Sequence, residues 1–239
     1  MSSTFEKTVN VVITTAAVVV AVSVAYRTFG PMRAGQGDTV TAEPDKIEGW
    51  EEVLAFANPI GGDPTAPVKL IIVTDLECPV CATFHRTVNE VLKRRSADLN
   101  VLYVSFPLPN HRFAEPAARV ADCADHRGAF RPMIDAIYDK QDSLGLRPWT
   151  AFAKDAGIQD TLFIARCALA TDPVDRIARG RRFGERIRLA GTPTVIINGW
   201  RYPYPPTVQD VDNAIDAVLD GREPRGEART VAERERASK

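Results

Sequence analysis

The fold of this chain is decided by the stretch VKLIIVTDLECPVC, residues 68–81. Its first half, residues 68–74, is a short run of mostly apolar and β-branched side chains, which is typical of a central strand buried on both faces. Residues 83–95 follow with apolar side chains at helical spacing. Cys78 and Cys81 therefore lie where a buried strand passes into a helix.

Two cysteines at such a junction form the arrangement that thiol–disulfide exchange requires. Free backbone N–H groups at the start of a helix stabilise an anion, so a Cys78 thiolate there has a lowered pKa and is a nucleophile. Pro79 suits the first helical position, where its missing N–H has no partner to lose. Cys81 lies one turn on, placed to attack a mixed disulfide at Cys78. This chemistry uses only sulfur, so we expect no cofactor.

A zinc site is the alternative interpretation of the two cysteines. A structural zinc ion is usually held by four ligands, and CPVC supplies two. The three histidines, His85, His111 and His126, have no ligand spacing to one another. His85 shares a helical face with Cys81, but a fourth ligand is still lacking. We therefore expect no metal, and we expect His85 to be an ordinary half-exposed helix residue.

The remaining predicted elements follow in a regular order along the chain. They are a strand at 100–106, helices across 115–189, strands at 194–197 and 200–204, and an amphipathic helix from 208 to 219. The dipeptide Asn198-Gly199 between the last two strands is a strong hairpin signal. The order strand, helix, strand, helical insert, hairpin, helix predicts an α/β fold whose first two strands pair in parallel through a right-handed crossover.

In these motifs the chain resembles the thioredoxin superfamily and, within it, the DsbA-like thiol–disulfide oxidoreductases. The resemblance rests on the order and spacing of five motifs: TDLECPVC at 74–81, Phe84-His85, FPLPNH at 106–111, AARVADCA at 117–124 and GTPT at 191–194. It covers about residues 49–221. It implies a thioredoxin fold, with a central mixed β-sheet flanked by helices, over 50–221 and a helical domain inserted at about 113–189.

The resemblance also implies roles for residues of the site. Cys78 would be the nucleophile and Cys81 the resolving cysteine. Substrate would bind at Thr192 and a cis Pro193, beside Pro79 and Val80, with an extended chain pairing to the Thr192 backbone as an added strand. A proline that merely begins a strand is the alternative at this position.

One position departs from the family pattern. Members often carry a buried acid six residues before the nucleophile, and here that residue is Ile72. Asp75 and Glu77 are nearer to the cysteines, and we expect them to be exposed loop acids. A negative charge close to Cys78 would raise the pKa of its thiol.

Cys123 and Cys167 lie in two helical patterns of the predicted insert. They are either two small buried hydrophobes or a structural disulfide that joins the helices. Because a disulfide is permitted outside the cytoplasm, we favour the bridge for an extracytoplasmic domain.

The ends of the chain differ from the middle. Residues 9–26 contain no charged side chain, and 18 residues of helix span roughly 27 Å, enough for a bilayer core. We expect an uncleaved anchor, with a signal peptide cleaved after Ser23-Val24-Ala25 as the alternative. We expect residues 1–8 to form a short tail, 27–49 a tether, and 222–239 a charged flexible tail.

Charge and composition limit the partners. The chain has 30 Lys+Arg against 31 Asp+Glu, a net charge of −1, which argues against nucleic-acid binding. The arginines at 176–188 suit a solvated helix whose apolar side chains pack inward. We expect a membrane-anchored, extracytoplasmic oxidase of cysteine-containing proteins, recycled by a membrane redox partner. A reductase or isomerase, or a non-catalytic peptide-binding assembly factor, remain alternatives.

Overall fold

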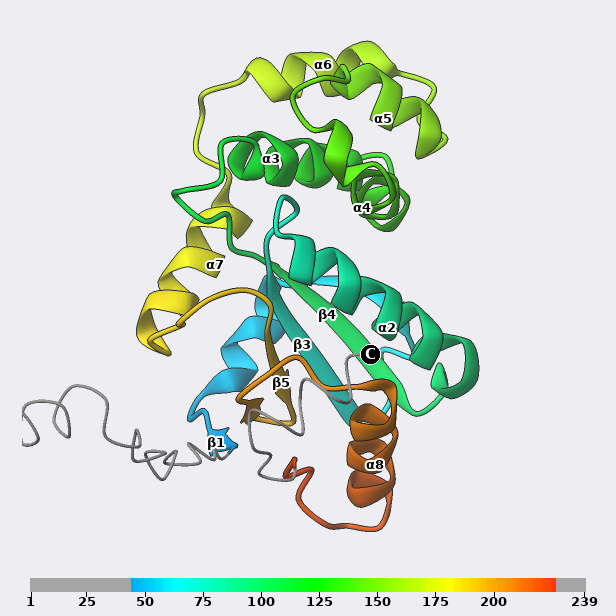
Figure 1. The fold of residues 1–239 in the computed structure, drawn as a ribbon, viewed down its shortest axis with the longest axis vertical. Helices are drawn as coiled ribbons and strands as arrows, with labels where there is room; N and C mark the ends of the chain where they lie inside the picture. The colour runs from blue at the N-terminus through cyan, green and yellow to red at the C-terminus, as the bar shows by residue number, and fades with distance from the viewer. Residues whose placement is uncertain (1–43, 227–239) are drawn as a thin grey trace, which may run out of the picture. The chain divides into compact units, whose positions relative to one another are not determined.

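A mixed β-sheet organises residues 44–226, the part of the chain that the computed structural model describes (Figure 1). Within that part six strands are hydrogen-bonded in the order β1-β6-β5-β3-β4-β2. The strands are β1 (Asp45–Lys46), β2 (Asn58–Gly62), β3 (Val68–Thr74), β4 (Leu99–Ser105), β5 (Thr194–Ile197) and β6 (Trp200–Tyr202). The thioredoxin-type mixed sheet expected from the sequence is thereby confirmed.

The strand that precedes the cysteines lies in the middle of the sheet. β3 pairs in parallel with β4 over its whole length, from Val68 opposite Leu99 to Thr74 opposite Ser105. On its other side β3 pairs antiparallel with β5. Six of its seven residues are buried, as the run of apolar side chains predicts. The carboxyl end of a central strand therefore delivers the cysteines to the edge of the core.

Helices cover both faces of the sheet (Figure 1). The helices of the described part are α2 (Pro79–Arg95), α3 (Ala114–Asp125), α4 (Phe130–Asp139), α5 (Trp149–Asp155), α6 (Thr161–Leu169), α7 (Asp175–Arg186) and α8 (Val208–Leu219), with 3-10 turns η1 (Trp50–Ala55) and η2 (Gln141–Ser143). Alternate residues of β3 point to opposite sides. Leu70 and Ile72 join the core under α2 and α8, whereas Ile71 and Val73 pack with η1 and α7.

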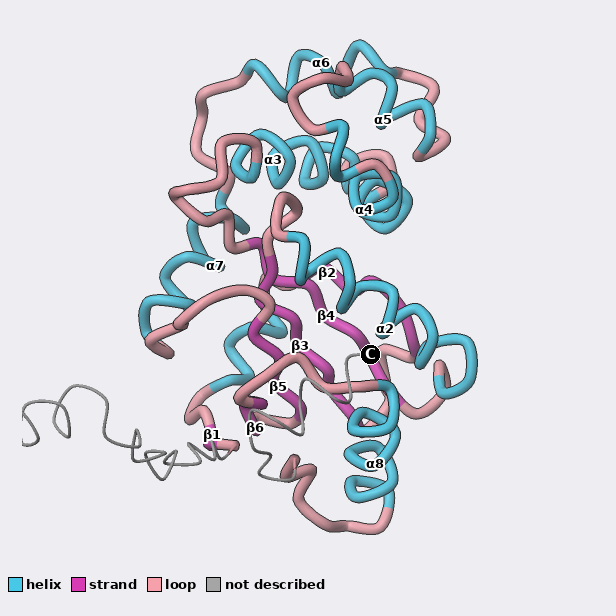
Figure 2. The backbone as a smooth tube through the Cα atoms, viewed as in Figure 1, coloured by secondary structure: helices cyan, strands magenta, loops and turns pink. Residues whose placement is uncertain are grey.

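The helical insert lies between β4 and β5 in sequence, as expected. Figure 2 shows α3 to α6 gathered beyond one end of the sheet, after which α7 returns alongside it. α7 approaches β4 closely at Gly180, where a Cβ atom would lie 2.1 Å from the Ser105 carbonyl oxygen. Ile177, Phe183 and Ile187 are buried on α7 and after it, which confirms the inward-packing interpretation of this arginine-rich helix.

The folded part extends beyond the predicted limits of 50 and 221 at both ends. β1 lies inside the predicted tether, and the Ile47 N–H donates to the Gly199 carbonyl at 2.8 Å. Pro224, in the predicted tail, is buried and accepts a hydrogen bond from the Tyr202 hydroxyl at 2.8 Å. β1 and β2 were not predicted from the sequence. β1 has only two residues, and β2 contains proline and glycine, so neither shows an alternation of apolar and polar side chains.

The predicted anchor at 9–26 lies outside the described residues, as do the tail at 1–8, most of the tether and residues 227–239. Among residues 44–226, none of the helices is both long enough and apolar enough to cross a bilayer.

Candidate functional site

The two site cysteines lie at the start of α2. Cys78 is the residue that caps the helix, with extended backbone angles, and Pro79 begins it. Both cysteines are free thiols, and their exposed fractions are 6% for Cys78 and 2% for Cys81. Cys81 is the less accessible of the two.

The loop before β5 meets Cys78 at the edge of the sheet where β3 ends and β5 begins. The Thr192–Pro193 peptide bond is cis. The Cys78 sulfur lies 3.4 Å from the Thr192 carbonyl oxygen, to which it donates a hydrogen bond when it is protonated. Val80 is 53% exposed and Pro79 is exposed. The structure thus brings Thr192 to Cys78, and leaves an open surface at the two residues between the cysteines.

The surroundings of the two sulfurs push their pKa values apart. The largest effect on Cys78 comes from the Cys81 thiol, which donates a hydrogen bond to the Cys78 sulfur. Together with hydrogen bonds from Thr192 and from the backbone N–H groups of Cys81 and Val80, it lowers the pKa of Cys78 to about 5, although burial of Cys78 acts in the opposite direction. Burial, followed by the same bond to Cys78, raises the pKa of Cys81 well above its ordinary value. Cys78 is therefore a thiolate at neutral pH, with Cys81 as its proton-bearing neighbour.

The expectation that Asp75 and Glu77 are exposed loop acids is wrong. The Asp75 side chain is buried, and its carboxylate accepts from the Glu77 N–H at 2.7 Å and the Leu108 N–H at 2.8 Å. His111 Nδ1 lies 2.8 Å from the same carboxylate and donates to it. Glu77 accepts from the Phe113 N–H at 2.5 Å. The two acids fix the loop before Cys78 to residues 108–113, and the predicted rise in the pKa of Cys78 is not seen.

The expectation for His85 is also wrong. Its side chain is buried, and Nε2 donates to Asp135 Oδ1 of α4 at 2.6 Å. The ring lies against Tyr138, with 4.8 Å between ring centroids. His85 therefore joins the site helix to the insert. No group of three or more His, Cys, Asp or Glu side chains suited to a metal ion occurs within the described residues.

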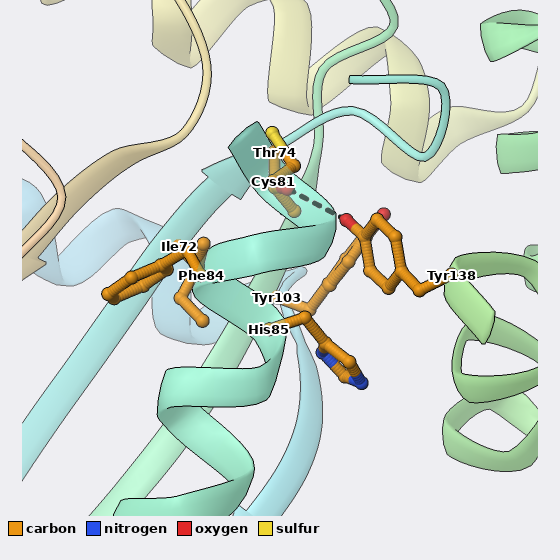
Figure 3. A pocket seen from close by; sticks show the side chains of 7 residues that line it. All are labelled: Ile72, Thr74, Cys81, Phe84, His85, Tyr103 and Tyr138. Carbon is orange, nitrogen blue, oxygen red and sulfur yellow. Dashed lines mark hydrogen bonds between the residues drawn. The ribbon is translucent and has the colours of Figure 1, made fainter. Parts of the chain in front are cut away.

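A small cavity lies behind Cys81 (Figure 3). It is lined by Ile72, Thr74, Cys81, Phe84, His85, Tyr103 and Tyr138. Its volume of about 10 Å³ is near the minimum for one water molecule. The dashed line in Figure 3 marks the bond between the Thr74 and Tyr138 hydroxyls, 2.9 Å apart. Ile72, at the position where the family often has an acid, contributes an apolar wall.

Cys123 and Cys167 form a disulfide between α3 and α6, with 6.4 Å between their Cα atoms. The four cysteines thus divide into a reactive pair at the sheet and a bonded pair in the insert. Sequence reasoning missed the second layer of the site: Thr74, Tyr138 and Asp135. Tyr138 and Asp135 carry no local signal, because their proximity to the cysteines depends on how α4 packs against α2.

Comparison with known proteins gives the family. A family model described as Thioredoxin matches residues 57–217. Curated relatives include the Na(+)/H(+) antiporter NhaA 1 of Mycolicibacterium gilvum, 28% identical over 160 residues, which are 66% of this chain and 26% of that protein. The antiporter NhaA 3 of Salinispora tropica is 28% identical over 174 residues, 69% of this chain and 26% of that protein. The chain spans about a quarter of the length of these relatives.

Solved structures share the fold at low sequence identity. A thioredoxin-like oxidoreductase from Silicibacter pomeroyi has a TM-score of 0.62 and 19% identity, covering 72% of this chain and 98% of that one. BdbD from Bacillus subtilis has a TM-score of 0.61 and 16% identity, and the match covers 76% of this chain and 98% of that one. Alpha-DsbA1 from Wolbachia pipientis has a TM-score of 0.59 and 19% identity, and the match covers 69% of this chain and 92% of that one. The chain belongs to the thioredoxin family and has the fold of the DsbA-like thiol–disulfide oxidoreductases.

Proposed function

We propose that this protein oxidises pairs of thiols in other proteins through a disulfide between Cys78 and Cys81. A substrate thiolate attacks the Cys78 sulfur, a mixed disulfide forms, and the bond to Cys81 breaks with Cys81 leaving as a thiolate. The second substrate thiolate then attacks the substrate sulfur of the mixed disulfide and releases Cys78. Two electrons pass from substrate to enzyme, and the substrate keeps the disulfide.

One observation carries the direction of this reaction: the pKa of Cys78 is lowered to about 5. A stabilised thiolate favours the reduced enzyme over the oxidised one. A dithiol whose reduced form is stabilised has a high reduction potential and acts as an oxidant. The low pKa also makes Cys78 the better leaving group when substrate resolves the mixed disulfide.

The binding proposal follows from the position of Thr192. A substrate chain would lie in extended form along Thr192 and Pro193, over the exposed Pro79 and Val80. Main-chain hydrogen bonds to an added strand are largely independent of side chains, which suits an enzyme with many protein substrates. The Thr192 carbonyl contacts Cys78, so a chain paired there would bring its own cysteine close to the nucleophile.

The proposed setting is the extracytoplasmic face of a membrane, with residues 9–26 as the anchor. The apolar run at 9–26 supports the anchor, and relatives named as antiporters are consistent with a membrane context. The disulfide between Cys123 and Cys167 supports an oxidising compartment. A membrane redox protein would return the Cys78–Cys81 pair to its disulfide form after each turnover.

The deciding experiment is the reduction potential of the Cys78–Cys81 pair, measured by equilibration with glutathione buffers and thiol trapping. We expect a value nearer to the about −120 mV of a strong oxidant than to the about −270 mV of thioredoxin. A value near the latter would contradict the oxidase and favour a reductase.

A pair of variants separates enzyme from peptide-binding factor. Cys81→Ala should accumulate substrates as mixed disulfides on Cys78, and Cys78→Ala should abolish oxidation. Full function in Cys78→Ala would instead identify a non-catalytic assembly factor.

A further inference from the structure

Cys81 presents a chemical difficulty in the proposed reaction. It must leave as a thiolate when substrate attacks Cys78, yet burial raises the pKa of its thiol. A thiol leaves more slowly as its pKa rises. The family position that often supplies a buried acid is occupied by Ile72, whose side chain offers no hydrogen bond. Another group must stabilise the charge that develops on Cys81.

A buried pair of hydroxyls lies at the required place. Thr74 is the last residue of β3, Tyr138 comes from α4, and their oxygens are 2.9 Å apart. Both side chains line the cavity behind Cys81 (Figure 3). The Thr74 hydroxyl hydrogen-bonds to Cys81 and lowers its pKa, against the effect of burial. The Tyr138 hydroxyl also reaches the Asp75 carbonyl oxygen at 3.4 Å.

The other polar groups around the cavity are already committed. His85 donates through Nε2 to Asp135. The Asp75 carboxylate accepts hydrogen bonds from Glu77, Leu108 and His111, and a carboxylate would in any case repel a thiolate. Ile72 and Phe84 carry no donor. Apart from the Thr192 side chain, which hydrogen-bonds to Cys81 from the loop before β5, this leaves the hydroxyls from Thr74 and Tyr138, with Tyr103 beside them.

We propose that Thr74, oriented by Tyr138 from the helical insert, donates the hydrogen bond that stabilises Cys81 as it leaves. The inference rests on the proposed function and deepens it: the insert takes part in the redox step. The substrate sulfur forms its bond to Cys78 as the Cys78–Cys81 bond breaks, and the electron pair of the broken bond stays on Cys81. No further oxidant or reductant is involved.

The hydroxyl pair can serve both protonation states of Cys81, since each hydroxyl both donates and accepts. When Cys81 is a thiol, Thr74 donates to Tyr138, and Tyr138 donates to the Asp75 carbonyl. When Cys81 is a thiolate, Thr74 turns to donate to sulfur, and Tyr138 turns to donate to Thr74. Rotation of the Thr74 and Tyr138 hydroxyls thus does what a buried ionisable acid would do, and it places no additional charge in the core.

The test compares Thr74→Val, Thr74→Ser and Tyr138→Phe in the full chain. The measured quantity is the rate at which dithiothreitol reduces the Cys78–Cys81 disulfide, followed by quenching and mass spectrometry. We expect Thr74→Val to be about tenfold slower or more, the effect of one hydrogen bond to a charged group. Thr74→Ser should keep nearly the original rate. Tyr138→Phe should be slowed less than Thr74→Val, and the double variant should match Thr74→Val because Tyr138 acts through Thr74.

Two controls separate this role from a structural one. The alkylation rate of reduced Cys78 by iodoacetamide should be the same in all variants, because only the leaving group is altered. Tyr202→Phe is the matched control: it removes another buried tyrosine hydroxyl, bonded to the Pro224 carbonyl, and should not change the rate of reduction.

Outcomes for the inference and for the proposed function differ. A Thr74→Val protein reduced at the original rate, or a slow variant that Thr74→Ser does not restore, would overturn the inference. A parent protein that forms no mixed disulfide at Cys78 would overturn the proposed function itself.

Discussion

The Cys78 sulfur lies 3.4 Å from the Thr192 carbonyl oxygen, although 114 residues separate them in sequence. The contact exists because β3 and β5 are neighbours in the sheet, with Val73 opposite Thr194. The end of one strand and the start of the other therefore meet at one edge. The Thr192 side chain is near both site sulfurs there, and its hydrogen bond to Cys78 is one of the interactions that lower the pKa of Cys78. A hydroxyl donor next to a sulfur stabilises the thiolate over the thiol.

The first prediction concerns this hydroxyl. Thr192→Val keeps the shape of the side chain and removes the donor, which contributes to the low pKa of Cys78 after the larger effect of Cys81. We expect the pKa of Cys78 to rise from about 5 by about 1. The pH dependence of iodoacetamide alkylation measures it. Thr194→Val, which removes a hydroxyl bonded to the Gly191 carbonyl, serves as control, and an identical profile in both variants would contradict the role of Thr192.

The second prediction links the thiolate to stability. The folded-state pKa of Cys78 is about 5, and an unfolded cysteine titrates near about 8.5. Between these values the unfolded chain binds a proton that the folded protein does not, so stability rises with pH. The gain is complete above the unfolded pKa and is lost as the pH falls through the folded one.

Urea unfolding of the reduced protein between pH 5 and about 8.5 tests this linkage. The parent should gain up to about 1.4 kcal/mol per pH unit relative to Cys78→Ala. Cys81 remains a thiol in the folded state throughout this range, because its pKa is raised, and its ionisation in the unfolded chain near the upper limit is common to both proteins. Parallel pH profiles for the two proteins would show that Cys78 is not an anion in the folded state.

Much of the fold follows from the sequence because its signals are local. The run at 68–74 and the pair Asn198-Gly199 each determine an element without reference to distant residues, and the structure has both elements where they were expected. The CPVC motif likewise places Cys78 at a helix start. By contrast, the strand partner of β1 is β6, which is distant in sequence: Asp45 lies opposite Arg201, 156 residues away.

The site's second layer was unpredictable for a related reason. Asp75 looks like a loop acid because its neighbours in sequence are polar and apolar in no regular pattern. Its burial is made possible by N–H donors from Leu108 and His111, which satisfy the carboxylate once the chain folds back. The burial of His85 is likewise made possible by its hydrogen bond to Asp135. Buried polar groups are determined by their partners, and partners distant in sequence leave no local pattern.

The third prediction is that Asp75 is a principal structural residue of the loop before Cys78. Asp75→Ala leaves the N–H groups of Glu77 and Leu108 and the ring of His111 without their acceptor. Unpaired buried donors cost about 1–3 kcal/mol each, so we expect a loss of roughly 3 kcal/mol or more in the free energy of unfolding.

Chemical denaturation of the reduced protein measures this loss. Glu223→Ala is the control, since its ion pair with Lys46 is on the surface and should contribute less than about 1 kcal/mol. Equal effects of the two substitutions would show that the buried carboxylate does not hold the loop.

The fourth prediction concerns the bond between Cys123 and Cys167, which are 44 residues apart. The bridge holds α6 to α3 at the outer side of the insert and closes a loop whose entropy in the unfolded chain is thereby reduced. Replacing both cysteines with alanine should lower the free energy of unfolding by up to about 4 kcal/mol. Because neither bridge cysteine is among the groups that shift the pKa of Cys78, that pKa should be unchanged.

Mass spectrometry of the Cys78→Ser/Cys81→Ser variant under non-reducing conditions should find no free thiol, and denaturation of Cys123→Ala/Cys167→Ala gives the energetic effect. If the first variant shows two free thiols, the bond does not form in the protein as produced. If the second variant unfolds like the parent, the insert is held by the apolar packing of α3, α5 and α6 alone. A loss of stability without a change in Cys78 alkylation is the combination that assigns this disulfide to the scaffold and leaves the redox chemistry to Cys78 and Cys81.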